Sequence, residues 1–118
     1  MKKILIVDDA LFMRTILRKI FEEEGYKISE ATNGKEMLNM YEIVSPDLVT
    51  LDITMDVMNG LDALKTLKAL HPEAKVIMCT AMGQKAMVTD AVLSGAVDFI
   101  VKPFDRERVL TAVNKVLK

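Results

Sequence analysis

The pattern that most constrains this chain is an alternation of two kinds of segment. Short apolar runs rich in β-branched residues are followed by segments with helical spacing of apolar residues, five times in succession. Such an alternation favours a parallel sheet with helices on both faces, joined by right-handed crossovers. We therefore predict an α/β fold with strands at residues 3–7, 26–31, 48–52, 75–79 and 98–101, and helices at 11–24, 35–44, 61–70, 84–93 and 105–117.

Length and composition narrow the possibilities further. The 118 residues suit a single domain spanning 1–118, and the net charge of -1 argues against broad binding to nucleic acid or to membrane surfaces. No apolar run approaches the roughly 20 residues of a membrane span, so no membrane insertion is expected. The one cysteine, Cys79, can form no internal disulfide, which predicts a reducing, cytoplasmic location. Cys79 lies in an apolar run and is expected to be buried.

A few residues indicate where elements begin and end. The second strand is the most polar, which places it at an edge of the sheet. Gly25 is expected to end the first helix, and Asn33 with Gly34 indicates a turn. Asn59 and Asp105 are predicted N-caps for the helices that follow them.

Polar residues stand at the carboxyl ends of four predicted strands. Asp8 and Asp9 follow the first, Asp52 ends the third, Thr80 follows the fourth and Lys102 follows the fifth. Taken alone, Asp52 would be explained as a strand-end Asp that starts a turn. In open α/β sheets, however, ligands bind beyond the carboxyl ends of the strands, where these side chains would converge.

This set of side chains favours a particular chemistry. Three clustered carboxylates repel one another and attract a cation, and oxygen ligands suit Mg²⁺ better than Zn²⁺. A divalent ion, a hydroxyl and an ammonium around one carboxylate suit phosphoryl transfer, and that carboxylate can itself be the acceptor. The chain has no glycine-rich phosphate loop of the Walker type, so a nucleotide is not the expected ligand.

Over essentially its whole length, the chain resembles the receiver domains of bacterial two-component response regulators, most closely those of chemotaxis. The resemblance rests on residues 4–9, 12–14, 52–55 with 58–60, 80–83 and 95–104. It implies a flavodoxin-like, doubly wound sheet of five parallel strands in the order 2-1-3-4-5. It also implies a Lys102–Pro103 peptide in the cis form.

The resemblance also implies roles for the residues at the strand ends. Asp52 matches the residue that accepts a phosphoryl group from a histidine kinase. Asp8 and Asp9 match the acidic pair that holds Mg²⁺, together with Asp52 and the backbone carbonyl of Thr54.

Two further residues match the groups that contact the phosphoryl group: the hydroxyl of Thr80 and the ammonium of Lys102. Phe99 matches an aromatic switch residue that swings inward as Thr80 moves toward the phosphate. This motion changes the surface formed by the fourth helix, the fifth strand and the fifth helix.

The expected function is therefore that of a phosphoacceptor regulatory protein rather than an enzyme. The effector expected from the resemblance is the flagellar motor switch, a phosphatase is a further expected partner, and we expect a monomer. No DNA-binding segment follows the last helix, which favours output by protein contact.

Three alternatives stay open. The first is a phosphorelay shuttle or a receiver with a non-motor partner. The second is an Asp-nucleophile phosphatase of the haloacid dehalogenase type, although Thr54 stands where its second Asp would be. The third is a phosphate-independent module with a decayed site.

The chain departs from the family pattern at four positions. Asp56 replaces the usual proline after Met55, and Phe99 lacks the hydroxyl of the tyrosine common in chemotaxis regulators. Thr54 and Met82 occupy positions that tune dephosphorylation in the family. Neither side chain is an acid or an amide that could orient an attacking water, so we predict slow autodephosphorylation.

Overall fold

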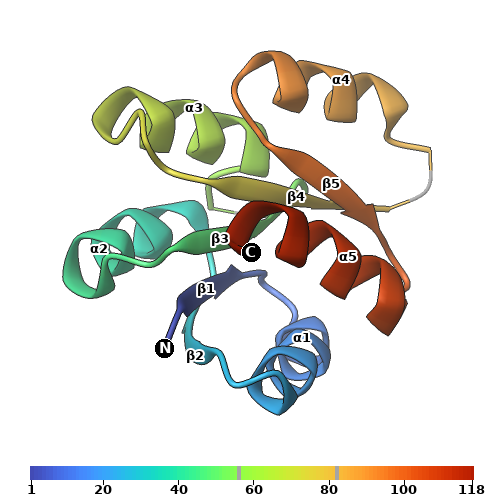
Figure 1. The fold of residues 1–118 in the computed structure, drawn as a ribbon. Helices are drawn as coiled ribbons and strands as arrows, with labels where there is room; N and C mark the ends of the chain where they lie inside the picture. Colours follow the sequence, from blue (N-terminus) through green and yellow to red (C-terminus); the bar gives the residue numbers. More distant parts are fainter. Residues whose placement is uncertain (56, 82) are drawn as a thin grey trace.

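Five strands and five helices alternate along the chain in the computed structural model, which describes residues 1–55, 57–81 and 83–118 (Figure 1). The departures noted at Asp56 and Met82 lie outside the described residues. The elements are β1 (Lys3–Val7), α1 (Leu11–Glu23), β2 (Lys27–Ala31), α2 (Gly34–Val44), β3 (Leu48–Asp52), α3 (Gly60–Leu70), β4 (Val76–Thr80), α4 (Lys85–Leu93), β5 (Asp98–Val101) and α5 (Arg106–Leu117).

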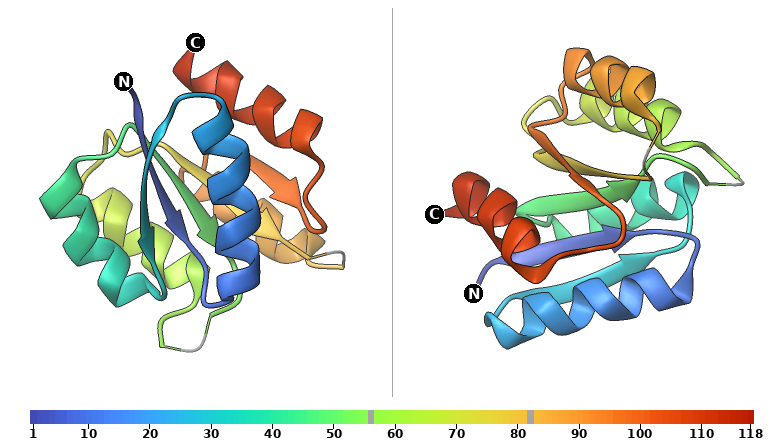
Figure 2. Two further views of the ribbon diagram at one scale, coloured as in Figure 1. Left: turned by 90° about the horizontal axis from the view of Figure 1, so that it is seen from below. Right: turned by 90° about the vertical axis from the view of Figure 1, so that its right-hand side faces the viewer.

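The strands form one parallel sheet in the order β2-β1-β3-β4-β5, which confirms the predicted fold and places β2 at an edge. Val7 pairs with Leu51, and Thr80 pairs with Val101, so the carboxyl ends of the strands align along one side of the sheet. The two chain termini lie at the opposite end, where the strands begin (Figure 2, left).

Side chains alternate between the two faces of the sheet and form two apolar layers. Leu5 and Val7 belong to the layer under α2, α3 and α4, whereas Ile4 and Ile6 belong to the layer under α1 and α5 (Figure 2, right). All five residues of β3 are buried, as expected for a central strand of a parallel sheet. Cys79 is buried as predicted. Among the described residues, no helix has the length and apolar character needed to cross a membrane.

The helix ends follow the local signals in part. Asn59 caps α3 as predicted, because its Oδ1 accepts a hydrogen bond of 2.9 Å from the backbone N–H of Asp62. Asn33 does more than form a turn, since its Oδ1 accepts from Glu36 N at 2.8 Å and caps α2. Asp105 occupies the N-cap position of α5, but its side chain makes no capping hydrogen bond.

Gly60 holds the loop after Asp52 close against the end of β3. Its N–H donates to the carbonyl oxygen of Ile53 at 2.6 Å. A Cβ at this position would overlap the carbonyl oxygen of Asp52 and the Cα of Ile53, so only glycine fits. The loop that follows Asp52 therefore returns directly to its own strand.

We expect Gly60→Ala to lower the free energy of unfolding by about 1–3 kcal/mol, because the new methyl group meets backbone that cannot move aside cheaply. Gly25→Ala is the control: its surroundings are open, but a φ of +86° disfavours any side chain, at a cost of about 1 kcal/mol. Urea denaturation measures both changes. The amide NMR signals of Asp52 and Ile53 should shift in Gly60→Ala alone. Wild-type stability in Gly60→Ala would contradict this packing.

Candidate functional site

Four of the predicted residues stand at the carboxyl ends of the strands, and the side chains of three of them, Asp8, Asp52 and Lys102, are in contact there. Asp8 follows β1, Asp52 ends β3, Thr80 ends β4 and Lys102 follows β5. Backbone hydrogen bonds continue past the strand ends and fix this edge: Lys102 N donates to the Thr80 carbonyl at 2.7 Å. The sheet therefore brings together residues that are up to 94 positions apart, from Asp8 to Lys102.

The ammonium of Lys102 lies between two buried carboxylates. Its Nζ is 3.1 Å from Asp8 Oδ2 and 3.2 Å from Asp52 Oδ1. Burial alone would lower the pKa of Lys102, but the charge of Asp52 and the hydrogen bond with Asp8 outweigh it and raise the pKa. Lys102 is therefore positively charged at neutral pH.

One ammonium does not balance the carboxylates around it. Asp52 is only 6% exposed, and this burial, together with the charge of Asp8, raises the pKa of Asp52 to about 6. Lys102 and the backbone N–H of Thr54 offset the shift only in part. In the absence of a cation, Asp52 is thus held in an electrostatically unfavourable environment.

The acidic cluster has the composition of a site for a hard cation. Asp8, Asp9 and Asp52 each place one carboxylate oxygen within 4.8 Å of the others. Asp8 Oδ1 accepts a hydrogen bond of 2.9 Å from Ala10 N, whereas the buried Oδ2 lies 3.1 Å from the Lys102 ammonium. Asp9 is exposed and gives access to solvent. Three carboxylates that share a single ammonium offer the oxygen donors and the negative charge that fit Mg²⁺.

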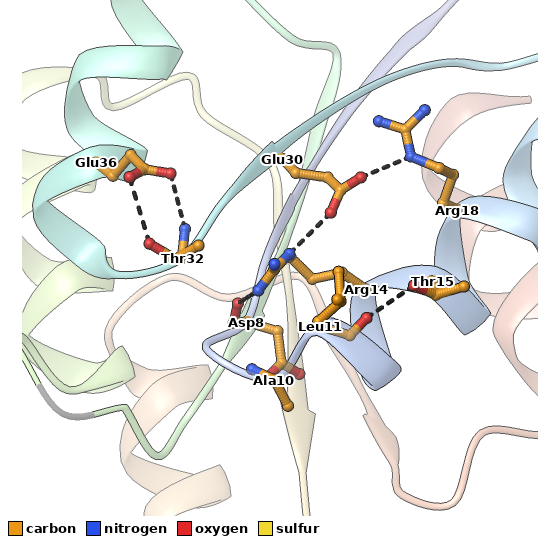
Figure 3. A network of polar contacts seen from close by, with 9 residues as sticks. All are labelled: Asp8, Ala10, Leu11, Arg14, Thr15, Arg18, Glu30, Thr32 and Glu36. Carbon is orange, nitrogen blue, oxygen red and sulfur yellow. Dashed lines mark hydrogen bonds and ion pairs between the residues drawn. The ribbon is translucent and has the colours of Figure 1, made fainter.

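A charged network supports the loop that carries Asp8 and Asp9 (Figure 3). Arg14 Nη1 donates to the backbone carbonyl of Asp8 at 2.7 Å, and Arg14 Nε pairs with Glu30 at 2.8 Å. Arg18 pairs with the other oxygen of Glu30 at 2.6 Å. Burial would raise the pKa of Glu30, but its hydrogen bonds with Arg18 and Arg14 lower it. Helix α1 is thereby tied to β2 and to the position of Asp8.

A second polar network lies on the other side of the site, and sequence reasoning missed it. Gln84 Oε1 accepts hydrogen bonds from Thr80 Oγ1 and from Ala81 N, both at 2.7 Å. Gln84 Nε2 donates to Thr54 Oγ1 at 2.8 Å. Its sequence signal is an amide placed four residues after Thr80, at the end of a loop of small residues.

The predicted switch residue Phe99 is half-buried and lies in β5, where it pairs with Met78 of β4. Phe99 and Thr80 line an open groove of about 550 Å³ beneath α4, together with Gln84, Val88 and others. The Lys102–Pro103 peptide bond is cis, as the resemblance predicts. The metal-ligand role expected for the backbone carbonyl of Thr54 stays a prediction.

Comparisons with known proteins agree with this geometry. Residues 4–114 match the family described as the response regulator receiver domain. The chain is 54% identical to the chemotaxis protein CheY of Thermotoga maritima, over 99% of this chain and 98% of that protein. It is 55% identical to CheY of Listeria monocytogenes over the whole length of both.

Solved structures give the same result. A crystal structure of the CheX-CheY-BeF3-Mg+2 complex from Borrelia burgdorferi contains a chain that is 40% identical to this one. The structural match covers 99% of this chain and 90% of that chain, with a TM-score of 0.93. In sequence, sheet order and strand-end residues, the chain belongs to the response regulator receiver domain family and is a CheY-like regulator of phosphorylation-dependent signalling.

Proposed function

We propose that Asp52 accepts a phosphoryl group from the phosphohistidine of a histidine kinase. The observation that carries this proposal is the grouping of Asp8, Asp9 and Asp52 within 4.8 Å, with the Lys102 ammonium beside two of them. We further propose that Asp8, Asp9, Asp52 and the Thr54 carbonyl hold Mg²⁺, and that one receiver unit spans residues 1–118.

The chemistry follows from the groups present. A carboxylate oxygen of Asp52 attacks phosphorus while the bond from phosphorus to the histidine nitrogen of the donor breaks. The Lys102 ammonium and the Thr80 hydroxyl lie on neighbouring strand ends and would stabilise negative charge on the phosphoryl oxygens. Three carboxylates and one ammonium leave a net negative charge at the site. Mg²⁺, when bound, would neutralise that charge.

The proposed output surface consists of α4, β5 and α5. It includes Phe99 and the groove beneath α4, and apolar side chains are exposed nearby, among them Leu93 at 82% and Val92 at 49%. Because relatives matched over nearly their full length include the chemotaxis proteins CheY of Thermotoga maritima and Listeria monocytogenes, we propose the flagellar motor switch as effector. The complex of a related CheY with CheX supports a phosphatase as a further partner.

Incubation with acetyl phosphate and Mg²⁺ should add one phosphoryl group, located on Asp52 by peptide mass spectrometry. Asp52→Asn should abolish the label because the nucleophilic oxygen is lost, and chelation of Mg²⁺ should abolish it in the wild type. Asp90→Asn, which removes an exposed carboxylate of α4, is the matched control and should label normally.

A label at another residue, or a label on Asp52 that does not depend on Mg²⁺, would contradict the proposed site. The label should also persist well beyond seconds, because the Thr54 side chain has no acid or amide group. Pull-down with the phosphorylated protein then separates the outputs: enrichment of the motor switch protein supports chemotaxis, and a phosphotransfer domain instead would indicate a relay.

Removal of the Asp52 charge should stabilise the cation-free protein. The carboxyl of Asp52 has a pKa of about 6 in the folded chain and 3.8 when unperturbed, so folding is penalised wherever Asp52 ionises. At 1.36 kcal/mol per pKa unit, Asp52→Asn should raise the free energy of unfolding at pH 7 by up to about 3 kcal/mol.

The sign fixes the pH window of this effect. Below pH 4 the carboxyl is protonated in both states and the two proteins should be equally stable. As pH rises from about 4 through the folded pKa of about 6, the wild type loses stability relative to Asp52→Asn, and well above that pKa the difference is constant. Urea denaturation in the presence of a chelator measures the difference in free energy of unfolding between wild type and Asp52→Asn. Added Mg²⁺ should make this difference smaller. Equal stability of the two proteins at pH 7 would contradict the unfavourable environment assigned to Asp52.

A further inference from the structure

We propose that Gln84 is a positioning residue that holds the Thr80 hydroxyl away from Asp52 and so opposes activation. The proposal rests on the proposed function, because it concerns the step at which Thr80 turns toward a phosphoryl group on Asp52. We call the three hydrogen bonds of Gln84 to Thr80, Ala81 and Thr54 the Gln84 latch.

The Thr80 hydroxyl has a single proton, which limits what it can do. In the unphosphorylated chain this proton points to Gln84 Oε1 at 2.7 Å, with the Ala81 carbonyl oxygen at 3.1 Å as the alternative acceptor. A phosphoryl oxygen on Asp52 needs the same proton. Thr80 therefore has to leave Gln84 before it can contact the phosphoryl group.

The amide of Gln84 is fixed at both ends, so it cannot simply follow Thr80. Its oxygen also accepts from Ala81 N at 2.7 Å, and its nitrogen donates to Thr54 Oγ1 at 2.8 Å. The side chain makes no capping hydrogen bond to its own helix α4. It instead joins the loop after β3 to the loop after β4, which are the two loops that flank Asp52.

The latch stands beside the space into which the switch would move. Thr80, Gln84 and Phe99 all line the groove of about 550 Å³ beneath α4. When Thr80 leaves Gln84, its hydroxyl becomes free beside the groove, and the groove has room for the Phe99 ring to change position. Hydrogen bonds that stabilise the inactive arrangement, with Thr80 bound to Gln84, lower the apparent affinity for any ligand that requires Thr80 to turn toward Asp52.

Gln84→Met tests the latch because it keeps the length of the side chain and removes all of its hydrogen bonds. The measured quantity is the apparent dissociation constant for beryllofluoride at saturating Mg²⁺. The chain has no tryptophan and four phenylalanines, so fluorine NMR of fluorinated phenylalanine follows Phe99. We expect Gln84→Met to bind beryllofluoride about three- to tenfold more tightly, the effect of losing one or two hydrogen bonds from the inactive state.

Two further variants distinguish a latch from general loosening of α4. Thr54→Val removes the anchor of the Gln84 amide and should tighten beryllofluoride binding in the wild-type background, but not in Gln84→Met. Thr89→Val removes a hydroxyl that donates to the Lys85 carbonyl at 3.2 Å, within α4, and should leave the affinity unchanged. A mere loss of stability would weaken binding in all of them, and thermal melts report such a loss.

The outcomes separate the latch from the site on which it rests. If wild type binds beryllofluoride at Asp52 but Gln84→Met binds it equally or less tightly, the latch is refuted and the proposed function stands. If Gln84→Met instead lengthens the lifetime of the phosphoryl group at unchanged affinity, Gln84 orients the attacking water and the latch is again refuted. If wild type binds no beryllofluoride, both proposals fall.

Discussion

The contact on which the candidate site depends is the approach of Lys102 to Asp8 and Asp52. Its distances of 3.1 and 3.2 Å are possible only because parallel strands bring their carboxyl ends to one edge. The ammonium balances one of three nearby carboxylates, and burial together with the charge of Asp8 raises the pKa of Asp52 to about 6. The arrangement is therefore prepared for a cation and a phosphoryl group rather than for stability of the free protein.

The charged side chains at the carboxyl ends of the strands are held in place by the packing and hydrogen bonds around them. Two apolar layers fix the strands, and Gly60 packs the loop after β3 against its own strand. Arg14 holds the backbone of Asp8 through α1 and Glu30, while Gln84 joins the loops that follow β3 and β4. The carboxylates of Asp8 and Asp52 are held at the ends of strands that are packed between the two apolar layers. The Gln84 latch instead borders the groove under α4, where side chains have space to move.

The fold could be predicted from the sequence because apolar residues recur with one spacing in strands and another in helices. Strand and helix patterns differ along the chain, and the polar residues at the ends of β1, β3, β4 and β5 are aspartates, a threonine and a lysine, which together indicate one chemistry. The roles of Arg14 and Gln84 could not be predicted in this way, since a single long polar side chain has no period and its partners are distant in sequence. The cap at Asn33 was missed for another reason: asparagine before glycine favours a turn as strongly as a helix start.

The central claim is that Asp52 accepts the phosphoryl group beside a cation held by the acidic cluster. A crystal structure grown with Mg²⁺ and beryllofluoride tests it most directly. The account predicts beryllium bonded to a carboxylate oxygen of Asp52 and an ion at about 2.0–2.1 Å from carboxylate oxygens of the cluster. Lys102 should have moved from Asp52 toward a fluorine atom. Beryllofluoride bound elsewhere, or Asp52 still paired with Lys102 and no ion at Asp8 and Asp9, would contradict the account.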